Sequence, residues 1–229
     1  DFFNKKIINI EKNIWKLNKI EIFTENFKNK KLLNFGNNSN ELFSIIRNFE
    51  LLNILEKSLS RNDHFKKFYK KINLNLIKNY DLVFNIDASN FISKKYFFRK
   101  IVKEYNSYAY TTVINHKKIK NNIAVQIFTK KGPLAFLPIS NSETSIVYSI
   151  NKSNIKNDED INNLIHSYNF KYKIKSIKKN IKFNLKSFHL RSYYFKNILA
   201  FGDLLHRIHP LAGQGFNMTI RDIKILLDI

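Results

Sequence analysis

The segment from Ile198 to Asp222 (ILAFGDLLHRIHPLAGQGFNMTIRD) constrains this chain more than any other part of it. It opens with an apolar run of the kind that forms a strand buried on both faces. Gly202 and Asp203 end that strand, and a polar loop then leads through Gly213–Gly215 into a helical pattern. Because a helix that begins at a glycine loop attracts negative charge, the segment predicts a site for a phosphorylated or anionic ligand. A simple strand-to-helix turn, which also favours Gly and Asp, is the alternative interpretation.

The same segment carries a long motif. Its positions are Gly202, Asp203, His206, His209, Pro210, Ala212, Gly213, Gln214, Gly215, Asn217 and Asp222. They follow the pattern G-D-A-A-H-x-x-H-P-x-A-G-Q-G-x-N-x-G-x-x-D. The segment therefore resembles the second flavin-binding motif of the FAD-dependent aromatic-ring hydroxylases, the para-hydroxybenzoate hydroxylase-like superfamily, and above all its ubiquinone-biosynthesis branch. Leu204 and Leu205 replace two alanines of the pattern, and Thr219 replaces its later glycine.

The resemblance implies that this segment lies beside the flavin of FAD. Asp203 would accept hydrogen bonds from ribityl hydroxyls, and the backbone N–H groups of Gly213–Phe216 would favour the anionic reduced flavin. Gly215 would let the backbone approach the ring, and Pro210 would stiffen the loop. The expected cofactor-binding residues are Gly202, Asp203, Pro210, Ala212, Gly213, Gln214, Gly215, Phe216, Asn217 and Asp87. No residue is assigned as a proton-transfer catalyst, because the flavin carries the chemistry.

A second apolar run, Tyr80–Ile86, ends on Asp87 and predicts another strand followed by a carboxylate. It resembles the family motif G-A-D-G-x-x-S-x-x-R, at which the chain passes the flavin and the reduced nicotinamide. The departures from that motif are Asn85 and Ala88 for the glycines, Phe91 for the serine and Lys94 for the arginine. Ser93 takes the place of the motif's serine only if this loop is longer than the loop of the family.

The N-terminal third predicts a short strand at Lys19–Thr24 and a helix from Glu41 to Ser58 that is capped by Asn40. The helix has an apolar face at helical spacing, made of Leu42, Ile45, Ile46, Phe49, Leu52 and Leu55. In the family an arginine near the flavin occupies the place of Leu52.

Short alternating segments between Tyr105 and Leu185 predict an antiparallel sheet with one buried face. Gly132–Pro138 (GPLAFLP) resembles part of the signature of the family's substrate domain, although Gln126 and Ile127 replace its acidic and basic residues. A short amphipathic helix is expected at Asp158–Tyr168. The lysine-rich alternation of Phe170–Leu185 predicts either a solvated strand face or a basic face for phosphate or anionic lipid.

The predicted fold class is α/β (α+β): a partial, Rossmann-like FAD-binding domain with an inserted antiparallel-sheet substrate domain. Residues 1–104 form the first part of the FAD-binding domain, residues 105–190 form the substrate domain, and residues 191–229 return to the FAD-binding domain. The glycines are Gly36, Gly132, Gly202, Gly213 and Gly215, which cannot make the G-x-G-x-x-G fingerprint that holds the FAD pyrophosphate. We therefore expect an N-terminally incomplete hydroxylase that is inactive alone.

The resemblance implies a monooxygenase that uses FAD, with NAD(P)H as the reductant. Reduced flavin would take up O2 as a C4a-hydroperoxide and transfer one oxygen atom to an aromatic quinone precursor, with or without a polyprenyl tail. A catalytically degenerate or assembly-only relative is the alternative, since Leu52, Ala88 and Ile127 depart from the family. No metal is expected, because His206 and His209 lack cysteine or clustered acidic partners.

The formal net charge of +22 raises nucleic acid or an anionic membrane as a partner. The lysines are spread along a chain rich in Asn, Ile, Phe and Tyr, which is typical of an AT-rich coding sequence, so we expect no specific nucleic acid partner. A basic nucleic-acid-binding protein remains a lesser alternative. The chain has no cysteine and no apolar run near ~18 residues. We therefore expect a cytoplasmic location, with peripheral association at the inner face of the membrane or with a biosynthetic complex.

Overall fold

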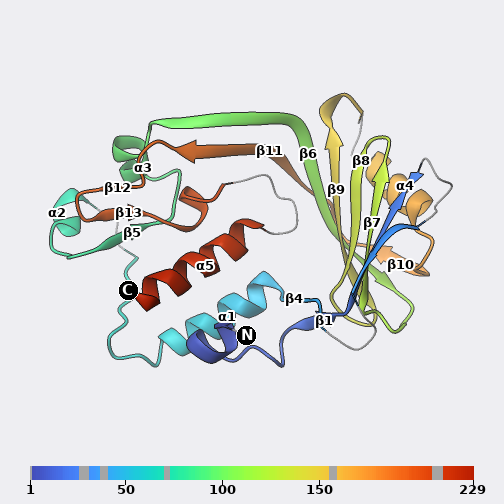
Figure 1. The fold of residues 1–229 in the computed structure, drawn as a ribbon, viewed down its shortest axis with the longest axis horizontal. Coiled ribbons are helices and arrows are strands. Elements are labelled where there is room, and N and C mark those ends of the chain that lie inside the picture. The colour runs from blue at the N-terminus through green and yellow to red at the C-terminus, as the bar shows by residue number, and fades with distance from the viewer. Residues whose placement is uncertain (1, 26–30, 37–40, 70–72, 155–158, 208–213) are drawn as a thin grey trace. The chain divides into compact units, whose positions relative to one another are not determined.

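The computed structural model describes residues 2–25, 31–36, 41–69, 73–154, 159–207 and 214–229 (Figure 1). The chain divides into two compact units. The first, here called the motif unit, contains residues 1–7, 62–105 and 185–229, and the second, the sheet unit, contains residues 8–61 and 106–184. Residues 8–61 thus belong to the sheet unit, whereas the sequence groups them with the FAD-binding part. The functional division of the chain remains a prediction.

The sheet unit is built on the expected antiparallel sheet, in the strand order β10-β6-β9-β8-β7-β2-β3, with β11 also paired to β6. The strands are β2 (Lys19–Thr24), β3 (Lys31–Phe35), β6 (Lys100–His116), β7 (Ile123–Thr129), β8 (Gly132–Pro138), β9 (Glu143–Asn151), β10 (Ile174–Ile177) and β11 (Ile181–Leu190). Neighbouring strands run antiparallel except for β2 and β7, which are parallel. The predicted strand at Lys19–Thr24 and the predicted antiparallel sheet are confirmed.

Helix α4 (Glu159–Tyr168) contributes to the core of this sheet, as its apolar spacing predicts. Ile161 and Ile165 are fully buried in one cluster with strand residues such as Tyr110 and Tyr148. Along β9 every second side chain is buried, because successive residues of a strand point to opposite faces. The start of β11 differs from the prediction, since residues 181–184 are exposed on both faces.

A chain of buried polar side chains ties several segments of the sheet unit together. His116 Nδ1 lies 2.8 Å from the carbonyl oxygen of Lys117, which only accepts, so Nε2 can accept from the Thr144 hydroxyl at 3.0 Å. Asn121 donates to Thr144 Oγ1 at 3.0 Å and accepts from the Tyr172 hydroxyl at 3.0 Å. Burial raises the pKa of Tyr172 to about 12, so its phenol keeps the proton that it donates. Each of these buried polar side chains therefore has a hydrogen-bond partner.

The helix expected at Glu41–Ser58 begins later than predicted. Phe43–Ile45 forms strand β4 and pairs with β1 (Trp15–Leu17), so α1 spans only Asn48–Leu59. Its predicted apolar face is also wrong, because only Leu51 is buried, whereas Phe49 and Leu52 are 58% and 55% exposed. Arg47 occupies the N-cap, and the predicted cap, Asn40, lies outside the described residues.

The motif unit contains a small sheet in the order β12-β13-β5. Strand β13 (Ile198–Ala200) is parallel to β5 (Val83–Asn85) and antiparallel to β12 (Tyr194–Phe195). The hydrophobic core of the motif unit includes Ile92, Phe188, Ile198 and Leu204. The other elements are α2 (Leu74–Ile77), α3 (Phe91–Tyr96), α5 (Gln214–Asp228) and the short helices η1 (Phe3–Ile7) and η4 (Gly202–Leu204), with η3 (Lys152–Asn154) in the sheet unit. Within the described ranges, no helix is long and apolar enough to cross a membrane.

We expect Ile165→Ala to lower the free energy of unfolding by about 2–5 kcal/mol, since it leaves a cavity between α4 and the sheet. Asn163→Ala, at an exposed position of the same helix, is the matched control and should change stability little. Urea unfolding of the whole chain measures both effects. Equal effects of the two substitutions would contradict the packing of α4.

Candidate functional site

The candidate site lies where two neighbouring parallel strands end. Ala200 of β13 is in register with Asn85 of β5, and the amide of Phe201 donates to the carbonyl oxygen of Asn85 at 3.0 Å. Asp87 therefore follows one strand and Asp203 follows the other at the same edge of the sheet. Ligands of α/β proteins bind outside the carboxyl ends of parallel strands, so both carboxylates stand where such a ligand would lie.

Gly202 allows the sharp turn after β13. Its φ of +56° lies in the left-handed region, and it is buried beside the side chain of Ile86. The amides of Leu205 and His206 both donate to the carbonyl oxygen of Gly202, at 3.0 and 2.8 Å. This single turn leaves Asp203 exposed, with no hydrogen-bond partner for its carboxylate among the residues that the structure describes.

The first turn of α5 carries the next part of the motif. The helix begins at Gln214, and Gln214, Phe216 and Asn217 are exposed. A Cβ atom at Gly215 would lie 3.1 Å from the carbonyl oxygen of His206, so only glycine fits this close approach without a shift. The predicted site residues Pro210, Ala212 and Gly213, together with His209, lie outside the described residues.

An ion pair fastens α5 to the turn that presents Asp203. His206 Nε2 contacts Asp222 Oδ2, and the two side chains are only 12% and 23% exposed. Thr219, which replaces the family's glycine, donates from Oγ1 to the carbonyl oxygen of Gly215 at 3.1 Å within the helix. Within the described stretches, no three His, Asp or Glu side chains gather as ligands for a metal. His206 thus acts in the structure as a partner of α5.

Asp87 sits in a tight loop of its own. Its Oδ1 accepts from the hydroxyl and the amide of Ser89, both at 2.7 Å. These hydrogen bonds, the hydroxyl first, with a smaller contribution from the charge of Lys94, hold the pKa of Asp87 below its usual range. Asp87 is exposed and is therefore a carboxylate anion at neutral pH.

Buried amides hold this loop, and the sequence analysis missed their role. Asn85, only 3% exposed, donates to Ser93 Oγ at 2.8 Å and accepts from Asn90 at 2.6 Å. Ser93 in turn donates to the carbonyl oxygen of Asp87 at 2.6 Å, and Asn90 caps α3. Ser93 is thus a buried structural residue. The sequence signal for this buried network is Asn85 itself, a polar residue near the end of an otherwise apolar run.

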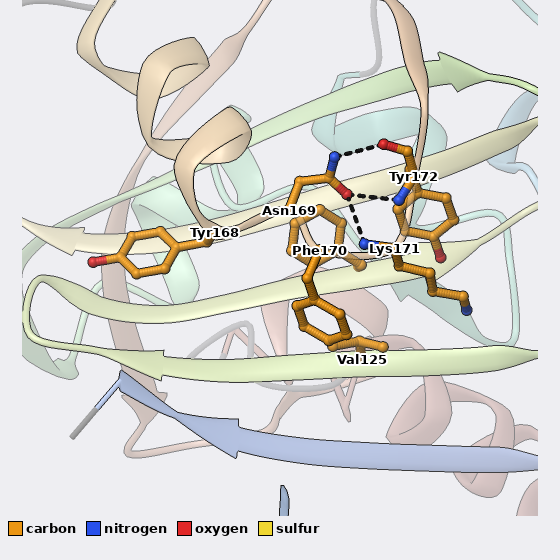
Figure 2. A pocket seen from close by; sticks show the side chains of 7 residues that line it. Val125, Tyr168, Asn169, Phe170, Lys171 and Tyr172 are labelled. Atoms are coloured by element: carbon orange, nitrogen blue, oxygen red, sulfur yellow. Dashed lines mark hydrogen bonds between the residues drawn. The ribbon is translucent and has the colours of Figure 1, made fainter. Parts of the chain in front are cut away.

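Among the residues that the structure describes, two of the hollows lie in the sheet unit, and neither of these is lined by a residue of the motif. Figure 2 shows the smaller one, where Asn169 bonds the backbone of Lys171 and Tyr172 and closes a turn. Burial lowers the pKa of Lys171 to about 8, and its ammonium donates to the carbonyl oxygen of Ile123 at 3.0 Å. The larger hollow, of about 280 Å³, is polar and includes Arg47.

Residues 97–228, more than half of the chain, match the family model described as an FAD binding domain. The chain belongs to this FAD-binding family. The match covers Asp203 and α5, and it confirms the resemblance found in the sequence.

Curated relatives belong to ubiquinone biosynthesis. Ubiquinone biosynthesis monooxygenase COQ6, mitochondrial, from Danio rerio is 27% identical over 150 residues, which cover 48% of this chain and 31% of that protein. The 3-demethoxyubiquinol 3-hydroxylase of Escherichia coli is 30% identical over 110 residues, covering 45% of this chain and 28% of that protein. The matches thus span less than a third of the relatives' length.

Solved structures share the fold. The probable FAD-dependent monooxygenase PqsL from Pseudomonas aeruginosa superposes with a TM-score of 0.68 at 14% identity, covering 94% of this chain and 68% of that one. The flavin-dependent halogenase CmlS gives a TM-score of 0.65 at 12% identity, covering 96% and 46%. These likenesses confirm the predicted mixed α/β fold class.

We expect Asp222→Ala to destabilise the motif unit by about 1–3 kcal/mol, because it leaves the partly buried His206 without its charged partner. Hydrogen exchange of the Leu205 and His206 amides should accelerate as the turn loosens. Asp228→Ala, at the exposed end of α5, is the matched control. Unchanged exchange in the Asp222 variant would show that the ion pair does not hold the turn.

Proposed function

We propose that this chain forms the flavin-proximal part of an FAD- and NAD(P)H-dependent monooxygenase that hydroxylates an aromatic quinone precursor in ubiquinone biosynthesis. The observation that carries the proposal is the shared edge of β5 and β13, where Asp87 and Asp203 stand beside the motif that leads into α5. The names of the curated relatives support the pathway. The overall reaction is ArH + O2 + NAD(P)H + H⁺ → ArOH + H2O + NAD(P)⁺.

The residues of the site suit a flavin. Asp203 is an exposed carboxylate, as an acceptor for polyol hydroxyls must be. Gly215 lets the first turn of α5 pack closely against the backbone of His206, beside the turn that presents Asp203. When bound, FAD would supply the redox chemistry and the activation of O2.

Each part of the chain has a proposed task in this enzyme. Asp203 accepts from the ribityl hydroxyls, and the N-terminus of α5 favours negative charge on the reduced ring. Gly202 sets the turn that presents the carboxylate. Pro210, Ala212, Gly213, Gln214, Phe216 and Asn217 keep the cofactor-binding roles that the family motif implies. Asp87 lies at the neighbouring strand end, and residues 105–190 are proposed to bind the substrate.

A catalytically degenerate relative is the second candidate. Leu52, which stands where the family has an arginine near the flavin, is 55% exposed on α1. Asn85, whose side chain is buried, stands where the family has a glycine. These two departures from the family pattern are the reason for this second candidate.

The proposed substrate also suggests where the protein works. Quinone precursors with a polyprenyl tail reside in membranes, and the net charge of +22 favours attraction to anionic lipid. We therefore propose peripheral association with the membrane or with a biosynthetic complex.

We expect the isolated 229-residue chain to bind FAD weakly, because its five glycines cannot form the fingerprint that cradles the pyrophosphate. Asp203→Asn should weaken this binding by about a further tenfold, since a charge-assisted hydrogen bond becomes a neutral one. Asp228→Asn is the control. A titration with FAD, monitored by flavin fluorescence, measures binding to the unsubstituted chain and to both variants. Stoichiometric flavin on the purified chain would contradict the expected weak binding.

The enzymatic proposal is tested with the protein encoded by its complete reading frame. It should purify with FAD, oxidise NAD(P)H faster when a phenolic quinone precursor is added, and yield a product heavier by one oxygen atom. Labelled O2 identifies the source of that atom. A protein that holds flavin but never oxygenates the phenol would favour the degenerate relative.

A further inference from the structure

Two stretches of the motif unit contain many cations and no carboxylate. Residues 88–103 and 185–202 include no Asp or Glu. Their lysines and arginines are Lys94, Lys95, Arg99, Lys100, Lys103, Lys186, Arg191 and Lys196, here called the basic surface. Such a concentration of one sign is an electrostatic footprint for an anionic partner.

The fold brings these two stretches together. The amide of Arg191 donates to the carbonyl oxygen of Arg99 at 3.0 Å. The rings of Tyr96 and Phe195 stack with centroids 4.1 Å apart and planes inclined by 14°. Figure 1 shows α3, β12 and the beginning of β6 at one end of the motif unit. The two stretches are therefore neighbours in the fold, although they lie about 90 residues apart in the sequence.

Several cations of the basic surface lie over aromatic rings, while the charge of Lys94 acts on Asp87. The ammonium of Lys100 lies 5.0 Å from the ring centroid of Phe188, and the ammonium of Lys95 lies 5.5 Å from that of Tyr96. In the part of the chain that the structure describes, no member of the basic surface forms an ion pair with a carboxylate. Their positive charge remains available to an external anion.

Apolar side chains interrupt these cations on the outside of the protein. Phe98, Ile101 and Val102 are 59%, 57% and 49% exposed, and Tyr193 and Tyr194 are 55% and 70% exposed. Residues 100–104 of β6 are exposed on both faces. Because strand residues alternate, one face carries Lys100 with Val102 and the other carries Ile101 with Lys103.

A lipid headgroup layer matches this mixture. Cations bind lipid phosphates, while aliphatic and aromatic side chains enter the boundary between headgroups and hydrocarbon. Nucleic acid would use the cations but would gain little from exposed Ile101 and Val102. The mixture of charge and aliphatic surface therefore favours a bilayer.

We propose that the basic surface docks this protein on an anionic lipid bilayer through headgroup phosphates, with Arg99 and Lys103 at the phosphates and Ile101, on the same face of β6 as Lys103, inserted among the lipids. The inference rests on the membrane association proposed above and is independent of the redox activity. The proposed lipid-binding residues are thus 94–103 and 186–196, whereas the sequence suggested a basic face at Phe170–Leu185.

Co-sedimentation of the whole chain with vesicles tests the proposal. We expect binding to vesicles of equal parts phosphatidylcholine and phosphatidylglycerol, and little binding to phosphatidylcholine alone. Arg99→Gln with Lys103→Gln should weaken binding about 30-fold, since each cation near an anionic surface contributes a factor of about five. Ile101→Thr should weaken it about threefold at unchanged charge, through lost apolar burial.

Matched controls separate this surface from general charge. Lys118→Gln with Lys120→Gln removes the same charge from exposed positions of the sheet unit, and Leu33→Thr replaces an aliphatic residue that is 53% exposed. Neither should change binding by more than about twofold. Circular dichroism melts verify that each variant folds. The assay needs no flavin or substrate, so its result is separate from that of the hydroxylase test.

Two results would overturn the proposal. If Arg99→Gln with Lys103→Gln and Lys118→Gln with Lys120→Gln weakened vesicle binding equally, net charge alone would attract the protein to lipid. Tighter binding to duplex DNA or RNA than to anionic vesicles, weakened by Arg99→Gln with Lys103→Gln but not by Ile101→Thr, would instead assign the surface to nucleic acid.

Discussion

The parallel pairing of β5 with β13 is the constraint on which the candidate site depends. The two strands lie more than one hundred residues apart, yet they are in register from Ile198 and Val83 to Ala200 and Asn85. Without this register, the carboxylates of Asp87 and Asp203 would not stand at one edge of a sheet. The chain leaves the motif unit along β6 and returns along β11. Hence residues 106–184 of the sheet unit are inserted in the sequence between the two strands that build the site, whereas residues 8–61 precede both.

The elements that could be predicted are those whose burial repeats along the chain. Strands β8 and β9 and helix α4 follow their apolar periodicity, because one face of each meets the core. The motif after β13 was equally readable, since Gly202 needs a positive φ and Gly215 needs a close approach. In these cases local chemistry and tertiary structure impose the same requirement.

The features that could not be predicted depend on partners distant in sequence. Helix α1 begins late because Phe43–Ile45 pairs with β1, and helical spacing says nothing about that competing pairing. Asn85 looks like a defect in a glycine motif, but hydrogen bonds to Ser93 and Asn90 make its buried amide part of the loop. The partner of His206 is likewise distant in sequence, since Asp222 reaches it from α5. Such outcomes require the folded chain.

Strands β6 and β11 each begin in one unit and end in the other, so the units share strands where many two-part proteins have a linker. Unfolding of either unit would fray the strands on which the other is built. The two units should therefore not lose their structure independently, and any exchange of the segment between β6 and β11 must preserve both strands that carry it.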